Sequence, residues 1–187
     1  MAVMLDIIGS FIIRASVVLI ILTTMVNLSD SLYRQSERAA LEILVTGAGE
    51  TIVNDLSLAG YNSASKLFLT ADSLQTRFYS DLDNDGAVEI VRYYLGPGAS
   101  GSHRILYRSL NGGTAFEIAR DVVLLQFTHY SVTGGSLLGT NVAGVKSVRI
   151  FLTVESNYKL RSLYSGRSDT LQYLKASWQG YVFPENQ

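Results

Sequence analysis

The residue types in one short segment are suited to binding a metal ion. Asp81-Leu82-Asp83-Asn84-Asp85-Gly86 places three carboxylates at alternate positions, and Glu89 follows three residues later. Alternating acids in a turn that Gly86 permits can converge on one hard cation such as Ca²⁺. The spacing matches the first half of an EF-hand loop, but Arg92 stands where the bidentate Glu belongs. The segment therefore predicts a Ca²⁺-binding hairpin loop whose ligands are Asp81, Asp83, Asp85, the carbonyl of Ala87, and Glu89.

The same segment also has a simpler interpretation. Turns rich in Asp and Asn are common without any ion, because these side chains hydrogen-bond to nearby backbone N–H groups. The flanking stretches Phe78–Ser80 and Val88–Leu95 alternate as strands do, so the loop does not join two EF-hand helices. Under either interpretation the loop has a structural role, not a catalytic one.

Groupings typical of enzymes are missing from the sequence. There is no Cys, which excludes thiolate nucleophiles and thiolate metal sites. His103 lies beside a Gly/Ser-rich loop and His129 lies in a predicted strand, so neither has the helical partner that a zinc motif needs. The sequence has no nucleophile-elbow motif, and the net charge of -1 gives no electrostatic basis for binding nucleic acid. We expect a protein that is not an enzyme and has no nucleic-acid partner.

The N-terminal segment is apolar enough to enter a membrane. Residues 11–28 form an 18-residue run, close to the roughly 20 that span a bilayer, and Arg14 near its start could snorkel to the surface. A signal peptide and a buried core helix are alternatives, although no small-residue cleavage pattern follows. We expect an anchor that also packs with other helices. The residues assigned to this assembly helix are Ile7, Ile8, Phe11, Ile12, Val17, Val18, Ile20, Ile21, Met25 and Leu28.

After this run the pattern becomes amphipathic. One apolar stripe steps by three or four residues from Leu41 to Ala59, which predicts one helix over about 5–59 that packs on a sheet. Gly60 is placed to end that helix, and Gly47 and Gly49 mark a weak point or bend within it. Such a helix would be on the order of 80 Å long, so lipid or other copies of the chain must cover its first half.

Short alternating segments follow the helix and predict an antiparallel sheet with one face free to pack on it. Gly-rich turns separate them, and Asn111-Gly112 is a tight-hairpin signal. The fold class is therefore α+β, with a helix over 1–60 and a β-rich head over 61–187. The expected strands are Lys66–Thr70, Gln75–Ser80, Ala87–Leu95, Arg104–Leu110, Asp121–Val132, Lys146–Glu155 and Thr170–Phe183, and a Gly-rich turn is expected from Gly96-Pro97-Gly98 through Ser102.

A series of short segments carries a family resemblance. The helix end Asn54–Tyr61, with its Ala-Gly-Tyr, is followed by the acidic loop at 81–89 and then by further segments in a fixed order. These segments are Ile105–Arg108, Ala119–Phe127, Val148–Ile150 and the terminal Pro184-Glu185-Asn186. In this order they resemble type IV minor pilins and the J-type minor pseudopilins of type II secretion, over nearly the whole chain.

The resemblance implies a subunit of a pilus-like or pseudopilus filament, whose partners are copies of itself or other pilin-like subunits. It implies an inner-membrane anchor with the head outside the cytoplasm, and a place at the cell surface or in an extracellular filament after assembly. The chain departs from the family near its start, where Gly9 is present but the Glu of the fifth mature position is not, since residue 14 is Arg14. This departure is consistent with a divergent relative whose N-terminus is not cleaved.

Two other functions compete with the filament subunit. One is a membrane-tethered module that binds Ca²⁺ or a glycan without polymerising, in which tyrosines of the head, such as Tyr94, Tyr107 and Tyr164, would line a sugar-binding face. The other is a tethered hydrolase, which would need an acid/base pair that only the loop at 81–89 could supply.

Overall fold

The computed structural model describes residues 2–64, 68–161 and 171–184. It contains a helix, α1 (Ala2–Ser57), followed by β-strands, which confirms the predicted α+β class. The chain divides into two compact units, Met1–Ala39 and Ala40–Gln187. The division lies inside α1 and not at residue 60, because the last turns of the helix pack with the strands.

The first unit consists of helix along its described length, and its large apolar side chains are exposed. From Ile7 to Leu28 the large apolar residues keep 50% to 72% of their surface exposed. The hydroxyls of Ser16, Thr23 and Thr24 each donate to the carbonyl four residues earlier at 2.8 Å. Internal satisfaction of polar groups is what a lipid environment demands. By length and composition, this helix could cross a membrane.

In the second unit, the end of α1 is amphipathic and fills the core. Leu41, Val45, Ala48, Ile52 and Leu56 are each at most 7% exposed, as the apolar stripe predicts. The helix ends at Ser57, two residues before the predicted end at 59. Gly60 has the predicted left-handed conformation, with a φ of +83°, in which a side chain would be strained. It lies beyond the last helical residue, and its amide donates to the carbonyl of Tyr79 at 2.7 Å.

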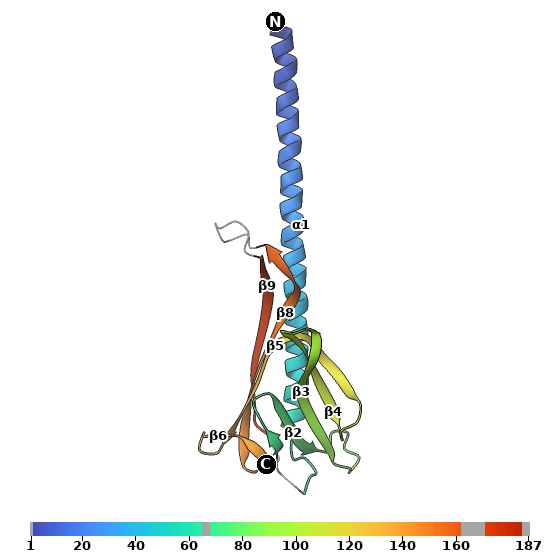
Figure 1. Cartoon of the computed structure of the whole chain (residues 1–187), viewed down its shortest axis with the longest axis vertical. Coiled ribbons are helices and arrows are strands. Elements are labelled where there is room, and N and C mark those ends of the chain that lie inside the picture. The colour runs from blue at the N-terminus through green and yellow to red at the C-terminus, as the bar shows by residue number, and fades with distance from the viewer. Residues whose placement is uncertain (1, 65–67, 162–170, 185–187) are drawn as a thin grey trace. The chain divides into compact units, whose positions relative to one another are not determined.

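Among the residues that the structure describes, the strands form one antiparallel sheet of nine members. Figure 1 shows how these strands lie beside the end of the helix. They run in the order β7-β1-β2-β3-β4-β5-β8-β9, with β6 paired to β5. The strands are β1 (Phe68–Ala71), β2 (Gln75–Ser80), β3 (Glu89–Ser100), β4 (His103–Leu110), β5 (Ala115–Ser131), β6 (Ser136–Leu137), β7 (Gly139–Val142), β8 (Val145–Arg161) and β9 (Leu171–Val182).

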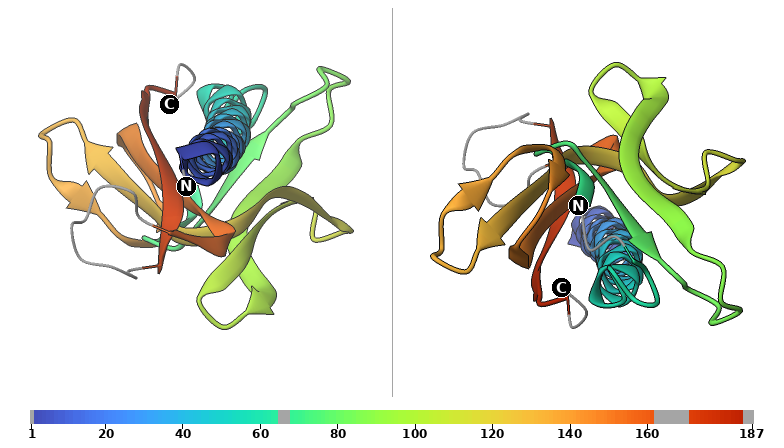
Figure 2. Two further views of the ribbon diagram at one scale, coloured as in Figure 1. Left: turned by 90° about the horizontal axis from the view of Figure 1, so that it is seen from above. Right: turned by 90° about the horizontal axis from the view of Figure 1, so that it is seen from below.

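The sheet curls around the helix segment Ala40–Ser57, as the views along the helix show (Figure 2). The curl brings early strands against β5, where the amide of Phe127 donates to the carbonyl of Ser73 at 2.8 Å. The Thr76 hydroxyl also lies 3.1 Å from Nε2 of His129, which joins β2 to β5. The concave face therefore encloses one continuous core with the helix at its centre.

The turn predicted over Gly96-Pro97-Gly98 through Ser102 is confirmed only at its end. The chain turns at Gly101 and Ser102, whereas Gly96-Pro97-Gly98 lies inside β3, with Pro97 opposite Arg104. The glycines serve close packing there, because a Cβ on Gly96 would lie 2.8 Å from a carbon of the Tyr107 ring. By contrast, Asn111 and Gly112 both adopt positive φ angles, as the predicted tight hairpin requires.

A partly buried polar contact joins the helix to the sheet. Oδ2 of Asp55 accepts a hydrogen bond from the Tyr93 hydroxyl and an ion-paired one from Nε of Arg108, both at 2.6 Å. Burial and the adjacent Asp55 carboxylate raise the pKa of Tyr93 above its ordinary value, so its hydroxyl stays a donor. Because Tyr93 is on β3 and Arg108 on β4, this contact fixes the helix against two strands.

Trp178 of β9 forms a second close contact with the helix. A Cβ placed on Gly49 would lie 2.6 Å from two carbons of its indole, and one on Gly180 would lie 2.7 Å from a third. The indole therefore occupies the space that a Cβ atom would fill at positions 49 and 180. Gly47, two residues before Gly49 on the helix, has no heavy atom within 4 Å of an added Cβ.

We predict that Gly49→Ala and Gly47→Ala shift stability in opposite directions. Alanine favours the helix by about 1 kcal/mol at either position. At position 49, overpacking against Trp178 costs about 1–3 kcal/mol, so the net change should be destabilising. Urea unfolding of the full-length chain in detergent micelles, followed by the fluorescence of Trp178, measures both effects. Equal stabilisation by the two variants would contradict the packing of the indole on Gly49.

His129 is buried in the core without a complete set of partners. It is fully buried, its ring lies 5.2 Å from that of Phe68, and its Nδ1 has no hydrogen-bond partner. Burial lowers the pKa of His129 from 6.5 to about 4. The folded state therefore holds a neutral imidazole at pH values where an unfolded chain would carry the charge.

We predict that His129 makes the fold sensitive to mild acid. Its contribution to stability is fully present above pH 6.5 and is lost as pH falls toward about 4, because only the unfolded chain binds the proton in that window. The loss should approach about 3 kcal/mol. Urea unfolding of the wild type and His129→Gln between pH 7.5 and 4 tests this, and an unchanged pH profile in the variant would disprove it.

Candidate metal centre

The end of the helix positions the acidic loop. β2 ends at Ser80 and β3 begins at Glu89, so the loop spans 81–88. The Ser80 hydroxyl donates to the carbonyl of Leu58 at 2.8 Å, and the amide of Asp81 donates to the carbonyl of Tyr61 at 3.1 Å. Two residues that follow the helix, Leu58 and Tyr61, thus hold the last residue of β2 and the first residue of the loop.

Asp81 is the fixed part of the loop. It is only 1% exposed, and its two oxygens accept hydrogen bonds from the amides of Asp85 and Gly86 at 3.1 Å each. The side-chain amide of Asn62 donates to Oδ2 at 2.9 Å. The bond from Asn62, followed by the backbone bonds, lowers the pKa of Asp81 below its ordinary value against the opposing effect of burial. Asp81 is therefore a carboxylate whose position is held by three donors.

Three of the predicted ligands lie together. One carboxylate oxygen from each of Asp81, Asp83 and Glu89 falls within 4.8 Å of the other two. Glu89 is also oriented, because its Oε2 accepts a hydrogen bond from the amide of Leu82 at 3.0 Å. Asp83 is exposed, so the group opens to solvent on its side. Clustered carboxylate oxygens are the ligands that hard divalent cations prefer, so these three residues could hold a metal ion.

The other two predicted ligands have a different arrangement. Asp85 is outside the group of three, and its Oδ1 accepts a hydrogen bond from the amide of Ala87 at 2.7 Å. The side-chain oxygen Oδ1 of Asn84 accepts a hydrogen bond from the Tyr61 hydroxyl at 3.1 Å. The backbone of Asn84 has a φ of +59°. The sequence pattern did not reveal the parts that Asn62 and Tyr61 play, because both come from the helix end and reach the loop only through the fold.

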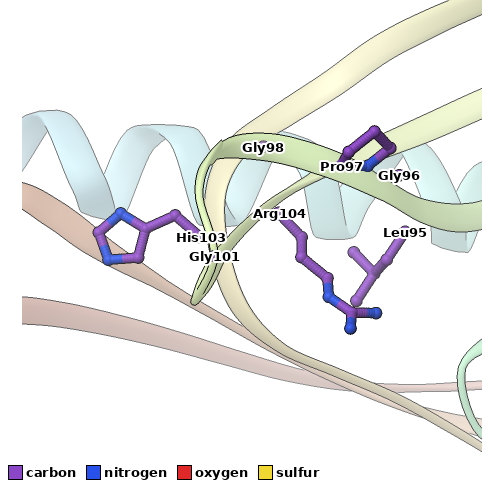
Figure 3. Close-up of a pocket in the computed structure, with 7 residues that line it drawn as sticks. All are labelled: Leu95, Gly96, Pro97, Gly98, Gly101, His103 and Arg104. Carbon is purple, nitrogen blue, oxygen red and sulfur yellow. The ribbon is translucent and has the colours of Figure 1, made fainter.

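A second polar cluster surrounds His103, which is 4% exposed. Its Nε2 lies 3.2 Å from Glu155 and its Nδ1 lies 3.4 Å from Asp121, while Lys175 pairs with the other oxygen of Glu155 at 2.7 Å. The cluster forms where β4, β5 and β8 have register irregularities, which the sequence did not predict. The cluster lies beside a depression of about 360 Å³ that His103 and Arg104 help to line. Their side chains point to opposite sides of β4 (Figure 3).

Comparison with known proteins gives no family for this chain. No protein-family model, no curated protein and no solved structure matches it. The relation to pilins and pseudopilins therefore stays a prediction from the sequence.

Proposed function

We propose that this chain is a structural subunit of a type IV pilus-like or pseudopilus filament. The observation that carries the proposal is the apolar surface of α1 from Ile7 to Leu28, where no large apolar side chain is less than half exposed. Burying each such side chain is worth about 1.5–3 kcal/mol, so a monomer in water would leave a large favourable contribution unrealised.

The same surface suits two successive environments. In the inner membrane, lipid would cover residues 7–28 and the head would lie outside the cytoplasm. In a filament, the helices of neighbouring copies would cover one another, and the heads would form the outer surface at the cell surface or beyond it. A contact that repeats head to tail without closing produces an open helical assembly.

We further infer that the acidic loop binds Ca²⁺ through Asp81, Asp83 and Glu89. Support comes from the convergence of three carboxylates and from the hydrogen bonds that hold Asp81 and Glu89 in place. An ion at this position would stiffen the connection between β2 and β3. The same loop favours the second candidate function, a membrane-tethered binding module that does not polymerise.

For the filament, we predict that cells producing the full-length protein release filaments when sheared. Electron microscopy of the sheared fraction should show them, mass spectrometry should identify this chain within them, and the N-terminal mass shows whether the start is cleaved. A charge at position 20 (Ile20→Asp) should abolish them, whereas Val132→Asp, at a position 74% exposed on the head, should not. Recovery of the wild-type chain only as single copies in the membrane fraction would favour the tethered module.

For the loop, we predict that Ca²⁺ stabilises the fold and that Asp83→Asn removes the effect. Ligand at 100 times its dissociation constant adds about 2.7 kcal/mol to the free energy of unfolding. Asp85→Asn is a matched control, because it removes the same charge while keeping the oxygen that Ala87 binds. Urea unfolding with Ca²⁺ or with EDTA provides the measurement. An equal response of both variants to Ca²⁺ would contradict the three-ligand site.

A further inference from the structure

Two arginines face each other on the outer surface of the sheet. Arg77 of β2 is paired directly with Arg92 of β3 in the antiparallel register. Their neighbours Phe78 and Val91 are buried in the core, and alternation along the strands therefore turns both arginines to the face away from the helix. Like charges at directly opposite positions destabilise a sheet.

Within the part of the chain that the structure describes, the two guanidinium groups lack some of the hydrogen-bond partners that they need. Nη2 of Arg92 donates to Oε1 of Gln75 at 2.9 Å, but Nε of Arg92 and Nε of Arg77 are buried and have no hydrogen-bond partner. Within residues 2–64, 68–161 and 171–184, no carboxylate forms an ion pair with either guanidinium. Buried donors without partners cost free energy, so this arrangement is unfavourable unless something outside the chain compensates it.

Aromatic packing holds one of the two arginines in place. The guanidinium of Arg92 lies 4.3 Å from the centre of the Tyr94 ring, and that ring stacks on Tyr107 with 5.7 Å between centres. Gly96 makes room for Tyr107, as described above. A guanidinium held over a ring loses less side-chain freedom when it forms paired hydrogen bonds to an oxyanion.

We propose that Arg77 and Arg92 bind the carboxylate or sulfate group of an acidic polysaccharide. Two guanidinium groups suit one such group, and the neutral polar side chains around them, Gln75, Tyr94 and Tyr107, suit the hydroxyls of a sugar. Nucleic acid fits less well, because it needs an extended basic surface and this chain has a net charge of -1. The proposal is independent of filament formation, since a tethered monomer would present the same face.

The first test is binding of the full-length protein in detergent micelles to a polyuronate oligosaccharide, with neutral dextran and oligodeoxythymidine as comparison probes. We expect polyuronate to bind with an affinity that falls at least tenfold in Arg77→Gln and in Arg92→Gln. Arg104→Gln removes an exposed arginine from β4 and should leave the affinity unchanged. Absence of polyuronate binding, tighter binding of the oligonucleotide, or equal losses in all three variants would each overturn the proposal.

A second readout separates recognition from folding. Arg77→Gln should raise the melting temperature while it weakens binding, because it removes the repulsion between the two charges. Arg77→Lys keeps the charge but loses the planar fork, so its affinity should fall without the gain in melting temperature. If Arg77→Gln instead lowers the melting temperature, the arginine stabilises the apo fold and the proposed ligand site is wrong.

Discussion

The burial of one stripe of α1 inside a curled sheet is the constraint on which the rest of the second unit depends. Ile52 and Leu56 have no exposed surface, and they belong to the same core cluster as residues of β1, β3, β5 and β8. A sheet with one apolar face must cover it, and here a single helix does so. The Asp55 carboxylate then sets the rotation of that helix, since only one orientation reaches both Tyr93 and Arg108.

The position of the acidic loop follows from this packing. The chain leaves the helix at Ser57, turns at Gly60, and places Tyr61 and Asn62 beside the residues that begin the loop. The carboxylate of Asp81 is therefore held by a donor from the helix end as well as by its own loop. Any ion bound by Asp81, Asp83 and Glu89 would be linked to the helix through these contacts and not through the strands alone.

Much of this fold could be predicted from the sequence, because its strongest signals are periodic. The stripe from Leu41 to Ala59 and the alternation in β2 and β8 reflect one buried face, so the elements and their inner sides follow from the residue types. The glycine at 49 could not be interpreted in this way, since its partner Trp178 is distant in sequence. The strands β6 and β7 have only two and four residues, too few to show an alternating pattern. The cluster around His103 depends on register irregularities that no local pattern encodes. The spacing of the acidic residues was enough to predict the loop. The hydrogen bond from Asn62 to Asp81 could not be predicted, because the two residues come together only in the fold.

The contact between Trp178 and α1 has a mechanical consequence for an anchored protein. Tension applied along α1 reaches the head through its last turns, where the indole is inserted against Gly49 and the Asp55 ion pair joins two strands. Sliding of the helix past the sheet would have to break the Asp55 ion pair and also displace the indole of Trp178, which packs closely against Gly49 and Gly180. If residues 7–28 anchor the chain, resistance to such shear would be shared between the packing of Trp178 on β9 and the ion pair of Asp55 with Arg108 on β4.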